Sequence, residues 1–130
     1  MPHIVVEYSA NLEADLDVRA LVGAIHVAVR DSGTFELGAI RTRAERRDVY
    51  VIADGDPQNA FVNVMLMIGP GRNAATKKRV SQLVMSVLEE ATRARFVTKG
   101  TALTVYVEEL DDAAASRTNN LHARMKAKAG

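Results

Sequence analysis

The sequence predicts an α+β domain whose elements follow the order strand–helix–strand–strand–helix–strand (β-α-β-β-α-β). Short apolar, β-branched segments bounded by turn residues are typical of strands. Two longer segments carry apolar residues at helical spacing. The two halves have similar length and helix spacing, which indicates a structural duplication. Right-handed crossovers would place both helices on one face of a four-stranded sheet.

The predicted domain occupies residues 1–112, and residues 113–130 form a polar, alanine-rich tail. At 130 residues the chain is long enough for one domain with a modest core. We expect residues 119–123 of the tail to be ordered against a neighbouring subunit, and residues 126–130 to fray.

Composition excludes several classes of protein. Apolar residues make up 48% and charged residues 25% of the chain, as in soluble globular proteins. The chain has no cysteine, which rules out disulfides, thiol nucleophiles and thiolate metal sites. No segment is apolar and long enough to span a membrane, and no signal peptide pattern is present. We therefore expect a cytoplasmic protein without a membrane partner.

The net charge of +1 is unevenly distributed. The charged residues after Asp112 are all basic: Arg117, Arg124, Lys126 and Lys128. Residues 1–112 therefore hold 13 basic and 16 acidic side chains, and their charge is −3. A domain with this charge is a poor candidate for binding nucleic acid, and we expect the basic tail to be solvated.

The first strand begins directly after Pro2 and runs through the apolar stretch 4–8. If Met1 is removed, Pro2 presents a secondary amine at the start of a buried strand. Burial and a nearby cation both lower the pKa of an amine, so this one could be neutral at pH 7 and act as a general base. The alternative is that Pro2 only begins the chain. If Met1 stays attached, the Pro2 nitrogen is an amide and cannot be a base.

The first helix is predicted from apolar residues at helical spacing: Val18, Leu21, Val22, Ile25 and Val29. Asp15 or Asp17 can cap its amino end, and Gly33 is suited to its carboxyl end. His26 lies beside the apolar face, where a histidine can be structural or catalytic.

Residues 37–43 predict the second strand, in which Arg41 and Arg43 point to the same side. Two cations on one face either discourage aggregation at a sheet edge or bind an anion. Residues 49–52 predict a further short strand, closed by the turn residues 53–57.

Residues 61–68 are almost wholly apolar, which is typical of a strand covered on both faces. One layer of helices covers one face only, so we expect another copy of the chain to cover the other. The last strand is predicted at residues 102–109, where apolar and polar residues alternate.

The second helix follows the Gly69–Arg72 turn, and cations crowd its amino end, where acids are usual. Free backbone N–H groups, glycines and a guanidinium together suit a carboxylate or phosphate, which favours Arg72 as an anion ligand. Lys77, Lys78 and Arg79 are expected to be solvated. The turn has neither the spacing of a dinucleotide-binding motif nor the Lys-Ser/Thr pair of a phosphate-binding loop.

Six segments of the chain carry a resemblance to a known family. They are Met1-Pro2-His3, Ala39–Arg43, Ala53-Asp54-Gly55, Ala60-Phe61-Val62, Ile68–Arg72 and Asn119–Ala123. In this ordered set, which spans nearly the whole chain, the sequence resembles the 5-carboxymethyl-2-hydroxymuconate isomerases of the tautomerase superfamily.

The resemblance implies a homotrimer of β-α-β-β-α-β subunits that works without cofactor or metal. It implies that Pro2 shuttles the proton and that Arg41 and Arg72 are catalytic. Arg43 is our second choice for a substrate-binding residue, and the alternative for it is a structural role. The implied substrate is a dienol di- or tricarboxylate from aromatic catabolism, specifically of homoprotocatechuate.

Residue chemistry and resemblance lead to one hypothesis: neutral Pro2 moves a proton while Arg41 and Arg72 bind carboxylates. Two alternatives stay open. A haloacrylate dehalogenase or hydratase of the same superfamily would need an acid to activate water, and Glu7, Glu108 and Glu109 are candidates. A non-catalytic trimeric binding protein would retain Met1.

Overall fold

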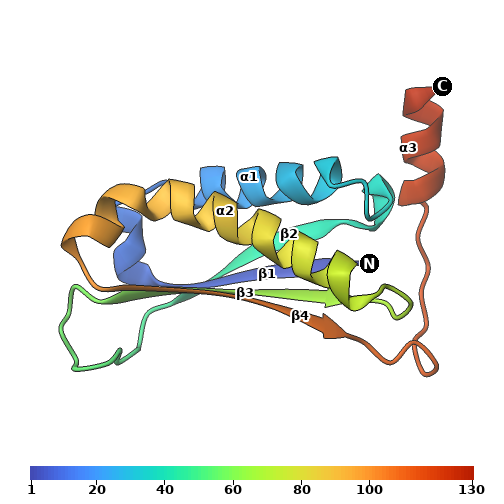
Figure 1. Ribbon diagram of the computed structural model, residues 1–130. Coiled ribbons are helices and arrows are strands. Elements are labelled where there is room, and N and C mark those ends of the chain that lie inside the picture. The colour runs from blue at the N-terminus through green and yellow to red at the C-terminus, as the bar shows by residue number, and fades with distance from the viewer.

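The computed structural model describes residues 1–130, and its two long helices lie side by side on one face of a four-stranded sheet (Figure 1). The strands are β1 (His3–Ser9), β2 (Arg41–Arg47), β3 (Ala60–Ile68) and β4 (Thr101–Glu109), in the spatial order β2-β1-β3-β4. β1 pairs in parallel with β2, and β3 with β4, while β1 and β3 are antiparallel. Two β-α-β units therefore meet back to back, which confirms the predicted fold class.

Local chemistry starts both long helices. Asp17 caps α1 (Val18–Asp31) by accepting a hydrogen bond from the Ala20 N–H at 3.1 Å. Asn73 caps α2 (Ala74–Thr98) through the Thr76 N–H at 2.8 Å. Of the two aspartates proposed as caps, Asp17 has this role. Asp15 lies just after a short 3-10 helix, η1 (Ala10–Ala14), and pairs with α2 instead.

The core lies between these helices and the sheet. It is a cluster of 17 buried residues, in which β3 contributes every second side chain: Ala60, Val62, Val64, Leu66 and Ile68. The alternate side chains of β3, among them Phe61 and Met65, are half-buried on the other face, which no helix of the chain covers (Figure 1). On the same face Tyr106 of β4 is 56% exposed. One chain therefore buries only one side of its most apolar strand.

The strand predicted at residues 49–52 is wrong, because this stretch belongs to a loop. Val49 and Val51 are 96% and 87% exposed. The register of β2 with β1 ends where Arg47 meets Ser9, so the chain beyond has no strand edge to pair with. The predicted second strand also starts too early, because residues 37–39 form the 3-10 helix η2 (Leu37–Ala39).

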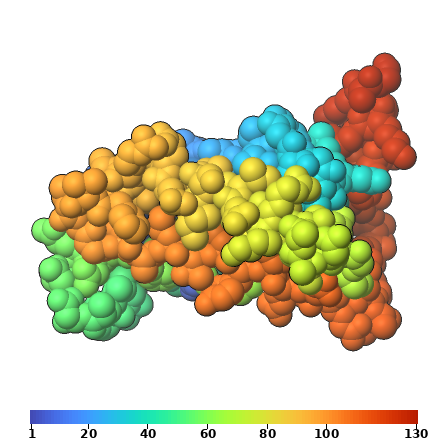
Figure 2. Space-filling model, in the orientation of Figure 1, coloured from blue at the N-terminus to red at the C-terminus, as the bar shows by residue number.

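The tail ends in a helix, α3 (Leu121–Ala129), which includes all but the last of residues 126–130, where fraying is expected. Alanine, lysine and methionine have high helix propensity, which accounts for the helix. No residue of α3 is buried, and the helix stands away from the sheet. Figure 2 shows the tail and the loop after β2 as projections at opposite ends of the molecule. None of the helices is both long and apolar enough to cross a bilayer.

Candidate active site at the amino terminus

The sheet topology brings the three predicted catalytic residues to one edge of the sheet. Because β1 and β2 are parallel, their first residues are neighbours: His3 is in register with Arg41, and the Pro2 carbonyl accepts a hydrogen bond from the Arg41 N–H at 3.1 Å. β3 runs antiparallel to β1, so it ends at the same edge, and the chain then turns through Arg72. Residues far apart in the sequence therefore converge beside buried Pro2.

A cavity of about 700 Å³ lies at this edge. Met1, His3 and Arg41 line it, whereas Pro2 and Arg72 are not part of the lining. The rest of its lining comes from the end of β4 and the tail: Leu110, Ala115, Ser116, Arg117, Thr118, Asn119 and His122. The cavity is rich in cations and hydrogen-bond donors, and no carboxylate lines it.

Neither Arg41 nor Arg72 forms an ion pair with a carboxylate of the protein. The Arg41 Nη1 donates to the carbonyl of Ala39 at 3.1 Å, directly after η2 turns into β2. The Arg72 Nη2 donates to the carbonyl of Thr34 at 3.2 Å, and its guanidinium carbon lies 4.5 Å from the centre of the Phe35 ring. Neutral contacts orient both guanidinium groups and leave their charge available to an anion.

These charges act on the terminal amine, which here belongs to Met1. Burial is the largest cause that lowers the pKa of this amine below its ordinary value of 8.0. The fields of Arg41, Arg117 and Arg72 lower the pKa further, in that order, and Asp112 alone opposes them. Any amine placed at this position loses its proton more readily than one in water, because its charged form is both desolvated and repelled.

Arg43 lies apart from the cavity lining. It follows Arg41 by two residues on the same face of β2, and its Nη1 contacts the His3 Nδ1 at 3.1 Å. Burial, followed by the fields of Arg43 and Arg41, lowers the pKa of His3. His26 is also distant from the lining: its Nδ1 lies 2.8 Å from the Thr42 hydroxyl and ties α1 to β2. For His26 the structure favours the structural role.

The three candidates for the acid that a water-adding reaction would need also lie outside the lining. Glu7 accepts a hydrogen bond from Arg47 at 2.7 Å, and Glu109 accepts one from Lys77 at 2.9 Å. Glu108 lies on β4 in register with Met67, on the face without helices. The structure contains no cluster of three or more His, Asp or Glu side chains suited to a metal ion.

The reasoning from sequence missed the contribution of the tail. Arg117, Asn119 and His122 line the cavity, whereas the tail's cations were expected to be solvated. The available signal was the position of Arg117 directly upstream of the Asn119–Ala123 segment that carries the resemblance. Net charge alone does not distinguish this arginine from the lysines that follow.

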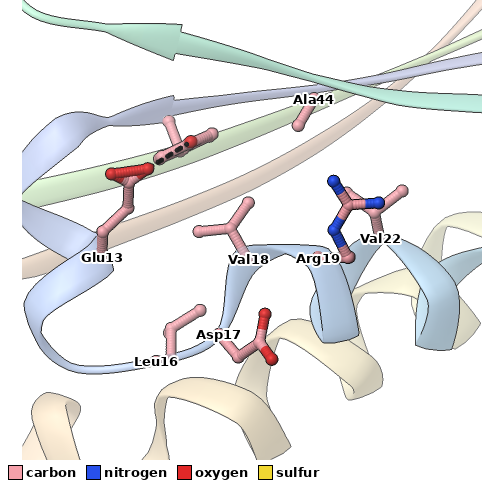
Figure 3. A pocket seen from close by; sticks show the side chains of 8 residues that line it. Glu13, Leu16, Asp17, Val18, Arg19, Val22 and Ala44 are labelled. Carbon is pink, nitrogen blue, oxygen red and sulfur yellow. Dashed lines mark hydrogen bonds between the residues drawn. The ribbon is translucent and has the colours of Figure 1, made fainter.

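A second hollow, of about 560 Å³, lies between α1 and the strands and contains none of the predicted site residues (Figure 3). The dashed line in Figure 3 marks the hydrogen bond from the Tyr8 hydroxyl to Glu13, 3.1 Å long. Glu13 also pairs with Arg46 at 3.2 Å. Aliphatic side chains and charges of both signs line this hollow, so it lacks the cationic character that an anionic substrate requires.

Comparisons with known proteins find relatives over nearly the whole chain. The family model described as "5-carboxymethyl-2-hydroxymuconate isomerase" matches residues 2–125. The 5-carboxymethyl-2-hydroxymuconate Delta-isomerase of Escherichia coli is 29% identical over 126 residues, which cover 97% of this chain and all of that protein.

Solved structures are similar over almost the same length. A 5-carboxymethyl-2-hydroxymuconate isomerase from Deinococcus radiodurans R1 matches with a TM-score of 0.88 and 33% identity, covering 95% of this chain and 93% of the other. A "fused 4-OT wild type symmetric trimer" matches with a TM-score of 0.62 and 11% identity over 89% of this chain and 93% of the other, which shows a shared fold alone.

Proposed function

The chain belongs to the 5-carboxymethyl-2-hydroxymuconate isomerase family, an isomerase family of the tautomerase superfamily, and on that premise we propose what it acts on and how. The proposed reaction is a proton transfer on 5-carboxymethyl-2-hydroxymuconate or a similar hydroxymuconate from the catabolism of homoprotocatechuate. It uses no cofactor. Pro2, exposed by removal of Met1, is the general base, and Arg41 and Arg72 bind substrate carboxylates.

One observation supports this proposal above the others: the partly buried amine of Met1 lies in a cationic cavity that Arg41 lines, and its pKa is lowered by Arg41 and by Arg72, neither of which has a carboxylate partner. An enzyme that abstracts a proton near pH 7 needs a base that is neutral at that pH. Burial and three nearby arginines lower the pKa of the amine in that direction. A dicarboxylate or tricarboxylate supplies the anions that the arginines lack.

The proposed chemistry has two steps. The neutral Pro2 nitrogen takes the enol proton, so that the O–H bond breaks, the ketone forms and negative charge spreads along the diene. The same nitrogen then returns the proton to a distant carbon, which leaves the remaining double bond conjugated with the ketone. Arg41 and Arg72 stabilise the negative charge of the intermediate, because both guanidinium groups are in place before that charge develops.

We further propose that the chain works as a homotrimer, in which neighbouring copies cover the face of the sheet without helices. Val5, Met65 and Tyr106 lie in one row across β1, β3 and β4 on this face. The Asn63 side-chain oxygen on the same face is buried and has no hydrogen-bond partner within the chain. The tail is proposed to meet a neighbouring subunit too, since α3 leaves Leu121 40% exposed.

Light scattering tests the assembly. The wild type is expected at three times the mass of one chain, and Met65→Glu is expected to lower that mass because it places a charge in the centre of the covered face. Gln82→Glu introduces the same charge on the exposed side of α2 and should leave the mass unchanged. A monomeric wild type, or a trimeric Met65→Glu variant, contradicts the proposed assembly.

Intact mass and an ultraviolet assay on hydroxymuconates test the chemistry. The mass should lack Met1, and Pro2→Ala should lower kcat about 10²- to 10⁴-fold, the usual contribution of a general base. Arg72→Ala should lower activity as well. Near wild-type turnover in both variants contradicts the mechanism. Retention of Met1 in the native host favours the binding protein, and chloride release from a 3-haloacrylate favours the dehalogenase.

A further inference from the structure

The tail segment that closes the cavity is anchored to the element that positions Arg41. The Asn119 side-chain amide donates to the carbonyl of Gly38 in η2 at 3.3 Å, and the His122 Nδ1 lies 2.9 Å from a Glu36 carboxylate oxygen. A side chain at Gly38 would place its Cβ only 2.8 Å from the His122 backbone nitrogen, so only glycine permits this approach. The tail therefore has a defined docking place beside β2.

This docking places Arg117 in the lining of the cavity, together with Met1. The charge of Arg117 acts on the terminal amine, whose pKa it lowers more than Arg72 does. Arg117 thus lies within electrostatic reach of the amine of Met1, the residue before the proposed base, although 76 positions separate it from Arg41 along the sequence.

Arg117 is held only by Asp112, with which it forms an ion pair. The two side chains are 49% and 42% exposed. An exposed ion pair of this kind contributes little to stability, so exchanging one carboxylate for another costs little. Asp112 occupies the position on Arg117 that a carboxylate of a ligand could take.

We propose that Arg117 is a third carboxylate-binding residue of this site and that it exchanges Asp112 for the carboxymethyl carboxylate of the substrate. The inference rests on the proposed function. A carboxymethyl-substituted muconate carries three carboxylates, and Arg41 and Arg72 account for two of them. Arg117 is part of the cavity lining and, like Arg72, lowers the pKa of the terminal amine, whereas Arg43 does neither and contacts His3 instead.

Two substrates separate this role from a structural one. Arg117→Ala should raise KM for 5-carboxymethyl-2-hydroxymuconate about tenfold, while KM for 2-hydroxymuconate, which lacks the carboxymethyl group, changes less than about twofold. Arg117→Lys should restore part of the loss. Asp112→Asn should lower KM for the tricarboxylate, because it removes the internal competitor. An equal loss with both substrates overturns the inference.

Arg124→Ala is the matched control, since it removes the same charge from an exposed position of α3 outside the cavity lining. Its kinetics should equal those of the wild type with either substrate. If Arg124→Ala reproduces the effect of Arg117→Ala, the overall charge of the tail is responsible and the inference is overturned.

Calorimetry distinguishes failure of this inference from failure of the proposed function. Wild-type protein should bind tricarballylate, an unreactive tricarboxylate, more tightly than the dicarboxylate glutarate, and Arg117→Ala should abolish that preference. If the wild type turns over no hydroxymuconate but this preference depends on Arg117, the proposed function fails and the anion site stands. If Arg117→Ala binds tricarballylate as tightly as the wild type does, the anion site fails.

Discussion

Arginines at the two ends of the sheet differ in the hydrogen-bond partners that the protein provides for their guanidinium groups. At the end far from the amino terminus, Arg95 is 5% exposed and each of its side-chain nitrogens has a fixed acceptor. Its Nε donates to Asp15 at 2.8 Å, and its Nη1 donates to the Gly100 carbonyl at 2.8 Å and to the Thr101 hydroxyl at 2.9 Å. The Nη2 donates to the Gln58 carbonyl.

At the other end, Arg41 and Arg72 each donate to a backbone carbonyl, and Arg72 also lies over an aromatic ring. Arg117 forms an ion pair with one exposed carboxylate. The comparison shows how one residue type serves two purposes. A buried guanidinium in which every nitrogen donates to a fixed acceptor connects α2 to the residue after η1 and to the first residue of β4. A guanidinium oriented by neutral groups keeps its charge for a ligand.

The largest effect is expected from Arg95→Ala. It leaves the Gln58 carbonyl without its donor and removes one of two donors from Asp15 and from the Gly100 carbonyl, so the free energy of unfolding should fall by about 3 kcal/mol. Urea unfolding measures the change. Arg93→Ala, two positions away on α2 at a 74% exposed side chain, should shift stability by less than about 0.5 kcal/mol. Equal losses of stability in Arg95→Ala and Arg93→Ala would contradict the structural role that we assign to Arg95.

Arg72→Ala should show the opposite pattern, with activity lost and stability kept. We expect kcat/KM to fall about 10²-fold, as when a preorganised donor is removed. The lost contact with Phe35 should cost less than about 1 kcal/mol of stability. Arg79→Ala is the control, because Arg79 contacts the neighbouring Thr34 hydroxyl at 2.9 Å and should matter little to turnover. A fall in stability comparable to that of Arg95→Ala would make Arg72 structural.

Asp15→Asn sharpens the comparison through pH. The hydrogen bond from Lys99 and then that from Arg95 lower the pKa of Asp15 below its ordinary 3.8, against an opposing effect of burial. The ionised carboxylate therefore stabilises the fold above pH 3.8, and this contribution is lost as the pH falls through the lowered pKa. Asp15→Asn should cost about 1 kcal/mol near neutral pH and progressively less in acid, as urea unfolding at several pH values would measure. A difference from wild type that does not change with pH would contradict this account.

The smallest effect is a displaced pH profile in Arg41→Ala. Removing this cation raises the pKa of the terminal amine, since Arg41 is the largest charge that lowers it. A base with a raised pKa stays protonated to higher pH, so the acid limb of kcat/KM should move to higher pH. Arg47→Ala removes a cation that Glu7 and Glu45 hold at the other end of β2, and it should leave the limb in place. If the acid limb of kcat/KM lies at the same pH in the wild type and in Arg41→Ala, the proposed effect of Arg41 on the pKa of the amine is contradicted.

Features that depend on neighbours along the chain were predictable. Helical spacing identified α1 and α2, and the cap at Asp17 follows from its side chain and position. The strand at residues 49–52 failed because a β-branched stretch becomes a strand only where another strand edge is within reach. In this chain that edge ends with β1 at Ser9.

The residues of the candidate site also divide into those that the sequence indicated and those that it did not. Pro2, Arg41 and Arg72 were proposed from the sequence, because their residue types suggest a base or an anion ligand before any fold is known and because the family resemblance includes them. Arg95 and Arg117 could not be assigned by that route. The sequence shows one as a cation within a helix and the other as a cation in a polar tail.

By itself, the sequence determined the order of the elements, the buried face of each long helix and the residues suited to proton transfer. Only the tertiary structure decided that Arg95 is buried among fixed acceptors and that the tail docks on η2 to bring Arg117 to the cavity. The physical reason is that periodicity and capping act within a few residues. The surroundings of a charge depend on segments that meet only after the chain has folded.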